Sequence, residues 1–200
     1  MALADPTVTA SFSIATPGDW FDIRLPQGEA AADELAARLA DSWPGQAISA
    51  EELRGVIRGL VLASAALDVL CAYATVVNGH GRLLPASLVI NAFPLRGKTL
   101  GEIADQLSGA DGASGTRSSY LVELLAGQAV RVERLREWDG SADGPHPLSL
   151  VVQYVVEIPG DSQALVLTFS TPALGLAEQL RPVFHAIAST LRFEPADHRR

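Results

Sequence analysis

Hydrophobic residues recur at every second position in the last third of the chain, from Leu148 to Ile158 and again from Leu165 to Phe169. A period of two predicts β-strands, and apolar residues on both faces of the first segment predict a strand covered on both sides. The intervening Pro159-Gly160-Asp161-Ser162 has turn chemistry, because proline fixes φ and glycine accepts a positive φ. We therefore expect a β-hairpin in this part of the chain.

The hydrophobic spacing then changes to three and four residues, which predicts a helix with one apolar stripe. Thr171 and Pro172 are expected to open this helix as its N-cap and its first-turn proline. Pro182 falls inside the stripe and should kink the helix or divide it. The stripe consists of Leu176, Leu180, Phe184, Ile187 and Leu191.

Similar patterns predict the elements of the first half. A hairpin is expected around Pro17-Gly18-Asp19, two helices between Ala30 and Leu67, and then a second hairpin. The last strand of that second hairpin is apolar on both faces, which places it near the centre of a sheet. The strands concerned are Val8–Ile14, Trp20–Leu25, Val69–Val77 and Leu83–Phe93.

Thr99 and Glu102 form a capping box that opens a short helix through Leu107, and Gly109 should end it. A loop rich in glycine, serine and alanine follows, and then a further hairpin made by Tyr120–Leu125 and Ala129–Trp138. The charged residues of its second strand indicate a solvated strand at a sheet edge.

Tight hairpins favour antiparallel pairing, and strands that are apolar on both faces need helices on both sides of the sheet. The predicted fold is therefore α/β in the α+β sense, a mostly antiparallel β-sheet sandwiched between helices. We expect a single domain over residues 1–200 with its core at about 8–193. The N-terminus, the 109–119 loop and the 195–200 tail are expected to be flexible.

Composition narrows the functional classes. The net charge of −8 argues against nucleic-acid binding, which needs a cationic surface. The single cysteine, Cys71, excludes an internal disulfide and favours a reducing cytoplasm. Met1–Thr16 does not read as a signal peptide, and the apolar run Gly59–Val77 reads as a buried helix leading into a strand, so no membrane insertion is expected.

The string most suggestive of catalysis is Gly97-Lys98-Thr99, which follows a strand and precedes a helix as in a phosphate-binding loop. That motif also needs a glycine at the position of Ala92, and Thr99 already has a role as an N-cap. Cys71 lies in an apolar run and reads as a buried residue. We expect no catalytic residue, cofactor or metal site; the histidines His80, His146, His185 and His198 lack ligand spacing, and His185 reads as a polar-face helix residue.

A protein-binding surface is the candidate site that remains. Arginine and tryptophan are enriched at binding hot spots, and four such residues come from one predicted edge strand. The alternative is an edge strand that its charges keep soluble. The candidate residues are Arg131, Arg134, Arg136 and Trp138.

Three strings give the chain a resemblance to the PsbP/Mog-like superfamily: Pro17-Gly18-Asp19-Trp20, Gly127–Arg131, and the stretch from Leu167-Thr168-Phe169-Ser170-Thr171-Pro172 to Ile187–Leu191. The resemblance covers Val8 to Phe193 and implies an α/β/α sandwich. It also implies a binding or accessory module without a catalytic centre, and no site residues can be carried over.

The sequence thus predicts a non-catalytic interaction or accessory module that binds a protein partner in the cytoplasm. The alternative is a carrier or sensor that holds a small apolar ligand between sheet and helices. A nucleotide-binding enzyme is the third hypothesis.

Overall fold

The computed structural model describes residues 11–22, 69–77, 83–109, 117–137 and 148–194, together with residues 33, 34, 37 and 51. The two helices expected between Ala30 and Leu67 lie outside these residues apart from the four isolated positions, which are helical. The described elements are β1 (Phe12–Ser13), β2 (Phe21–Asp22), β3 (Val69–Val77), β4 (Leu83–Pro94), α3 (Leu100–Gly109), β5 (Arg117–Leu124), β6 (Gly127–Glu137), β7 (Leu148–Glu157), β8 (Gln163–Thr171), the 3-10 helix η1 (Leu174–Leu176), α4 (Ala177–Ser189) and β9 (Arg192–Phe193).

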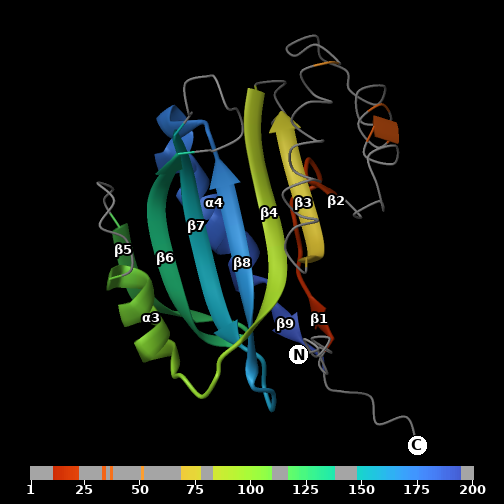
Figure 1. Cartoon of the computed structure of the whole chain (residues 1–200). Helices are drawn as coiled ribbons and strands as arrows, with labels where there is room; N and C mark the ends of the chain where they lie inside the picture. The colour runs from red at the N-terminus through yellow and green to blue at the C-terminus, as the bar shows by residue number, and fades with distance from the viewer. Residues whose placement is uncertain are drawn as a thin grey trace, which may run out of the picture.

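The main sheet has seven strands in the order β2-β3-β4-β8-β7-β6-β5 (Figure 1). Each pair of neighbouring strands is antiparallel. The sequence predicted a mostly antiparallel sheet with helices, and this fold class is confirmed. The predicted central strand, β4, lies between β3 and β8, as its two apolar faces require.

Helices α3 and α4 cover opposite faces of the sheet, and α3 is the nearer in Figure 1. The alternation along β7 shows why both helices are needed. Val152 and Tyr154 join the core under α4, whereas Val155 joins a smaller core under α3. We call these surfaces the α4 face and the α3 face.

Aromatic rings fill the centre of the α4 face. Phe184 of α4 stacks on Phe169 of β8 with a centroid distance of 4.9 Å. Trp20 meets both rings edge-on at 6.4 and 6.5 Å, and Tyr154 meets Phe169 edge-on at 5.9 Å. Such offset and T-shaped contacts add to the stabilisation from buried area, so this cluster holds α4 on the sheet.

The two long hairpins predicted from alternation, β3–β4 and β7–β8, are confirmed by their registers. The N-terminal hairpin prediction is wrong. The turn at Pro17 does form, since the Trp20 amide donates to the Pro17 carbonyl at 3.0 Å. However, β1 pairs with β9 in a separate two-stranded sheet, and β2 pairs with β3. Both pairings are long-range, so local pattern could not reveal them.

The start of α4 also corrects the sequence prediction. The Thr171 hydroxyl accepts a hydrogen bond from the Ala173 amide at 3.1 Å, and this turn leads into η1. Helix α4 begins only afterwards, with Leu176 as an N-cap that makes no side-chain hydrogen bond. The helix also continues through Pro182 as a single element.

Candidate functional site

Strand β6 is not the edge strand that its charges suggested. It pairs with β5 on one side and β7 on the other, so β5 forms the edge. The strand tolerates this interior place because Val130 and Val132 supply buried residues on the α3 face. On the α4 face, its charged residues Arg131 and Glu133 are bound by each other and by side chains of neighbouring elements.

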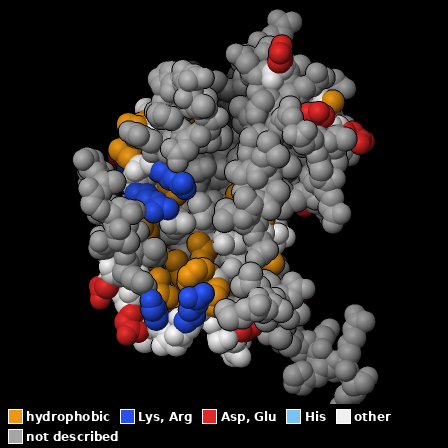
Figure 2. Space-filling model, in the orientation of Figure 1, with side chains coloured by type: hydrophobic (Ala, Val, Ile, Leu, Met, Phe, Trp, Pro, Cys, Tyr) orange, Lys and Arg blue, Asp and Glu red, His pale blue; other side chains and the backbone are white. Residues whose placement is uncertain are grey.

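The strand alternation divides the predicted arginine surface. Arg134 and Arg136 share the parity of Val130 and lie on the α3 face, where Figure 2 shows two groups of basic side chains. Arg131 lies on the α4 face, in register with Tyr154. Trp138 lies outside the described residues. The structure therefore brings Arg134 and Arg136 together and separates both from Arg131.

Glu133 binds two arginines, Arg131 on its own strand and Arg181 on α4. One of its oxygens, Oε2, accepts a hydrogen bond from Arg131 Nη2 at 3.0 Å. The other, Oε1, accepts from Arg181 Nε and lies 2.6 Å from Arg181 Nη2. Hydrogen bonding to Glu133 raises the pKa of Arg181, and Arg181 also pairs with Glu178 on its own helix. The result is a charged network along one flank of α4.

Two tyrosines extend this network. Arg131 donates from Nη1 to the Tyr120 hydroxyl, and its guanidinium lies 5.2 Å from the Tyr120 ring centroid and 5.9 Å from that of Tyr154. These distances are in the range of cation–π attraction. The hydroxyl of the fully buried Tyr154 lies 3.3 Å from His185 Nδ1. Burial raises the pKa of Tyr154 to about 12.

Sequence reasoning missed Arg181 and His185 as members of this cluster. His185 was expected on the polar face of its helix, but it is half-buried against Tyr154. The available signal was spacing: both residues directly follow a buried position of the stripe, Leu180 and Phe184 respectively. Polar residues so placed lie at the margin of the apolar face, where they can reach the sheet.

Replacing Glu133 with glutamine should lower the free energy of unfolding by about 1–2 kcal/mol, because two arginines lose a charged acceptor. The value is below that of a fully buried pair, since Arg181 keeps 29% of its side chain exposed. Chemical denaturation measures it, and Glu178→Gln is the matched control. Glu178 is 87% exposed and should cost less than about 0.5 kcal/mol. If both variants lost the same free energy of unfolding, the inference that Glu133 holds the charged network together would be wrong.

Exposed leucines lie at one end of the α4 face. Leu135 of β6 and Leu148 of β7 are diagonal neighbours on this face, and each is 43% exposed. Leu174 and Leu176 belong to η1, which packs against β7 just before α4 and leaves them 36% and 38% exposed. We call these four residues the leucine patch. Grouped apolar side chains rimmed by charged ones are typical of protein-binding sites.

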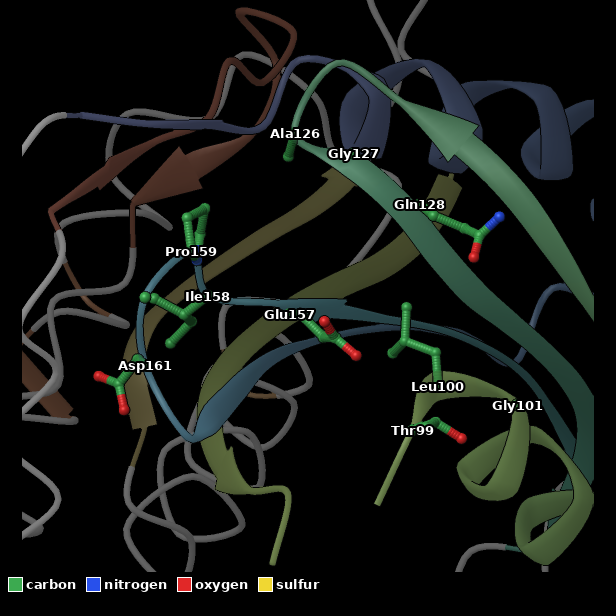
Figure 3. Close-up of a pocket in the computed structure, with 11 residues that line it drawn as sticks. Thr99, Leu100, Gly101, Ala126, Gly127, Gln128, Glu157, Ile158, Pro159 and Asp161 are labelled. Carbon is green, nitrogen blue, oxygen red and sulfur yellow. The ribbon is translucent and has the colours of Figure 1, made fainter. Parts of the chain in front are cut away.

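A polar cleft of about 470 Å³ lies at the opposite end of the sheet (Figure 3). It is bounded by the start of α3, the β5–β6 turn and the β7–β8 turn, and Glu157 extends into it toward Leu100. Its lining includes a second carboxylate, that of Asp161. A small apolar ligand would find few apolar partners in this cleft.

Of the string Gly97-Lys98-Thr99, only Thr99 lines this cleft, and its predicted capping box is confirmed. The Thr99 hydroxyl accepts from the Glu102 amide at 3.2 Å, and the Glu102 carboxylate accepts from the Thr99 amide at 2.8 Å. These bonds from Thr99 lower the pKa of Glu102. The Thr99 hydroxyl is therefore engaged in starting α3.

Cys71 was expected to be buried; it is half-buried and packs against the core of the α4 face. Burial, together with the charge of Asp22, raises the pKa of its thiol to about 11, so little thiolate forms at neutral pH. Among the described residues, no three His, Cys, Asp or Glu side chains are grouped as metal ligands. None of the described helices is long and apolar enough to cross a membrane.

The described part of the chain has an α+β fold, in which the main antiparallel sheet lies between α3 and α4. No protein-family model and no curated protein matches the chain. Among solved structures, it is similar to LpqN of Mycobacterium tuberculosis, described as involved in cell envelope biogenesis. The TM-score is 0.50 at 13% sequence identity, and the match covers 96% of this chain and 87% of that chain. At this identity the likeness shows a shared fold.

Proposed function

We propose that the protein is a non-catalytic accessory module that binds another protein. The leucine patch carries this proposal. Its residues come from β6, β7 and the η1 turn that precedes α4, and Leu135 lies two residues beyond Glu133 on the same face of β6. An apolar centre with a charged rim is the usual composition of a specific interface. The partner that fits is a protein segment with exposed apolar side chains, such as one face of an amphipathic helix.

Leu135 and Arg136 provide a matched pair of variants for the test. They are neighbours on β6, both are exposed, and the strand alternation places them on opposite faces. The tagged protein would be used to capture partners from lysate of its own organism, and the affinity of any purified partner would then be measured. We expect Leu135→Glu to weaken binding at least about tenfold and Arg136→Glu to leave it nearly unchanged.

The other outcomes are equally informative. Loss of binding only in Arg136→Glu would move the site to the Arg134–Arg136 side of the sheet, which the sequence proposed. If neither variant weakens binding, the leucine patch is not the binding site. If no partner is captured, the interaction proposal fails, and native mass analysis of the purified protein for a bound small molecule becomes the next experiment.

We further propose that the chain is a divergent member of the PsbP/Mog-like superfamily and acts in the cytoplasm. The fold shared with LpqN supports the first part at the level of architecture. The single cysteine supports the second. The compartment of a captured partner tests the proposed cytoplasmic location, because a partner confined to the cell envelope would contradict it.

A further inference from the structure

The outer edge of β5 is built as an open pairing surface. This strand is eight residues long and pairs with β6 without any register shift. No described strand pairs with its other side. Alternate main-chain N–H and C=O groups of an edge strand point outward, where they can pair with another strand.

Some of the features that usually protect an edge are missing from β5, whose charged residues Arg117 and Glu123 lie toward its ends. Its sequence contains no proline and no lysine, and its middle carries exposed apolar side chains. Tyr120 is 41% exposed on the α4 face, and Leu121 is 50% exposed on the α3 face. At the opposite edge of the sheet, β2 is only two residues long. Of the two terminal strands of the described sheet, β5 is therefore the longer.

The exposed residues lie at the midpoint of the strand, and this position favours self-association. When two copies of a strand pair about a two-fold axis, overlap is greatest if the axis passes through the midpoint. For β5 the axis then passes through Tyr120 or Leu121. Because the axis is perpendicular to the sheet, each face of one copy continues the same face of the other. Tyr120 therefore approaches Tyr120 or Val122 of the copy, and Leu121 approaches Leu121 or Ser119.

The charge on this edge is compatible with the same arrangement. Glu123 is the exposed acid of β5. With the axis at Tyr120 or Leu121, it lies opposite residue 117 or Ser119 of the copy and not opposite another Glu123. Like charges directly opposite each other destabilise a strand pair, and this register avoids them.

We propose that the β5 edge binds a second copy of this chain by antiparallel strand pairing, which joins two sheets into one. The pairing is closed, because a two-fold axis makes both copies use the same β5 edge. Leu121 and the leucine patch lie on opposite faces, so this inference is independent of the proposed function.

Sedimentation equilibrium of the whole protein over a range of concentrations tests the proposal. The unmodified chain should approach twice the monomer mass, and Leu121→Lys should weaken self-association at least about tenfold. Leu125→Lys is the control, because Leu125 is 69% exposed in the turn just beyond β5. It should leave the dimer intact. A chain that stays monomeric at its highest soluble concentration would overturn the proposal.

Crosslinking provides a second measurement that does not depend on how the lysine variant folds. Two variants are made in a Cys71→Ala background, one with Leu121→Cys alone and one with both Ser119→Cys and Leu121→Cys. At least one of them should form a disulfide-linked dimer under mild oxidation, because Leu121 lies opposite either Leu121 or Ser119 of the copy. Leu125→Cys should remain monomeric under the same conditions. If the protein dimerises but neither cysteine variant is crosslinked, and Leu121→Lys leaves the dimer intact, self-association occurs through another surface. That result would also overturn the proposal.

Discussion

Replacing Phe184 with alanine is expected to lower the free energy of unfolding by about 3–5 kcal/mol. The Phe184 ring is fully buried between α4 and the sheet. It stacks on Phe169 at 4.9 Å and meets Trp20 edge-on at 6.4 Å. Its removal leaves a cavity that its closely packed neighbours cannot fill, so the loss of stability exceeds the transfer free energy of the side chain. Urea denaturation of the two proteins measures the difference.

Phe93→Ala is the matched control for this experiment. Phe93 lies near the end of β4 and is 50% exposed, so its loss creates no enclosed cavity. We expect it to cost less than about 1 kcal/mol. If both variants lost the same stability, or if Phe184→Ala lost less than about 1 kcal/mol, the close packing of α4 on the aromatic cluster would be refuted.

The elements that could be predicted from sequence are those whose signals are local. The β7–β8 hairpin follows from alternation and from a turn with proline and glycine, all within one short stretch. The start of α3 follows from Thr99 and Glu102, whose capping bonds span three residues. In both cases the residues that specify the structure are also those that make its contacts.

Pairings between distant segments could not be predicted in this way. Phe12 of β1 pairs with Phe193 of β9 from the other end of the chain. Nothing in the local sequence of either strand indicates which strand it pairs with. The misplacement of β6 has a different cause. Arg131 and Glu133 were interpreted as solvent-exposed charges, although the intervening Val130 and Val132 pointed to a strand covered on its other face. A charged strand can lie inside a sheet when its charges are paired.

The candidate site could be predicted only in fragments for the same reason. Arg131 was recognised from composition, but its importance depends on Glu133 and on Arg181, which is 48 residues further along the chain than Glu133. The leucine patch combines residues of β6, β7 and η1, each unremarkable within its own segment. Topology assembles both features, and only the order of strands in the sheet reveals them.

Tyr154 should make the stability of the protein fall in alkaline solution. Its hydroxyl is fully buried, and burial raises its pKa from 10.0 to about 12 even though Arg131 lowers it. A group whose pKa is raised by folding stabilises the protein fully below the unfolded pKa, and that contribution is lost as the pH rises through the folded value. The loss therefore falls between pH 10 and pH 12. It should amount to about 3 kcal/mol.

The comparison of Tyr154 with Tyr154→Phe, both in a Cys71→Ala background, isolates this effect. The background is needed because the pKa of the Cys71 thiol is raised from 9.0 to about 11. Ionisation of this thiol therefore also lowers the stability of the protein, over a pH range that overlaps that of Tyr154. Near neutral pH the phenylalanine variant should be less stable by about 1 kcal/mol, since it lacks the bond to His185. Toward pH 12 it should become the more stable protein, because it has no buried hydroxyl to ionise. Denaturation curves at several pH values should thus cross, and curves that stayed parallel would show that the hydroxyl is not buried in solution.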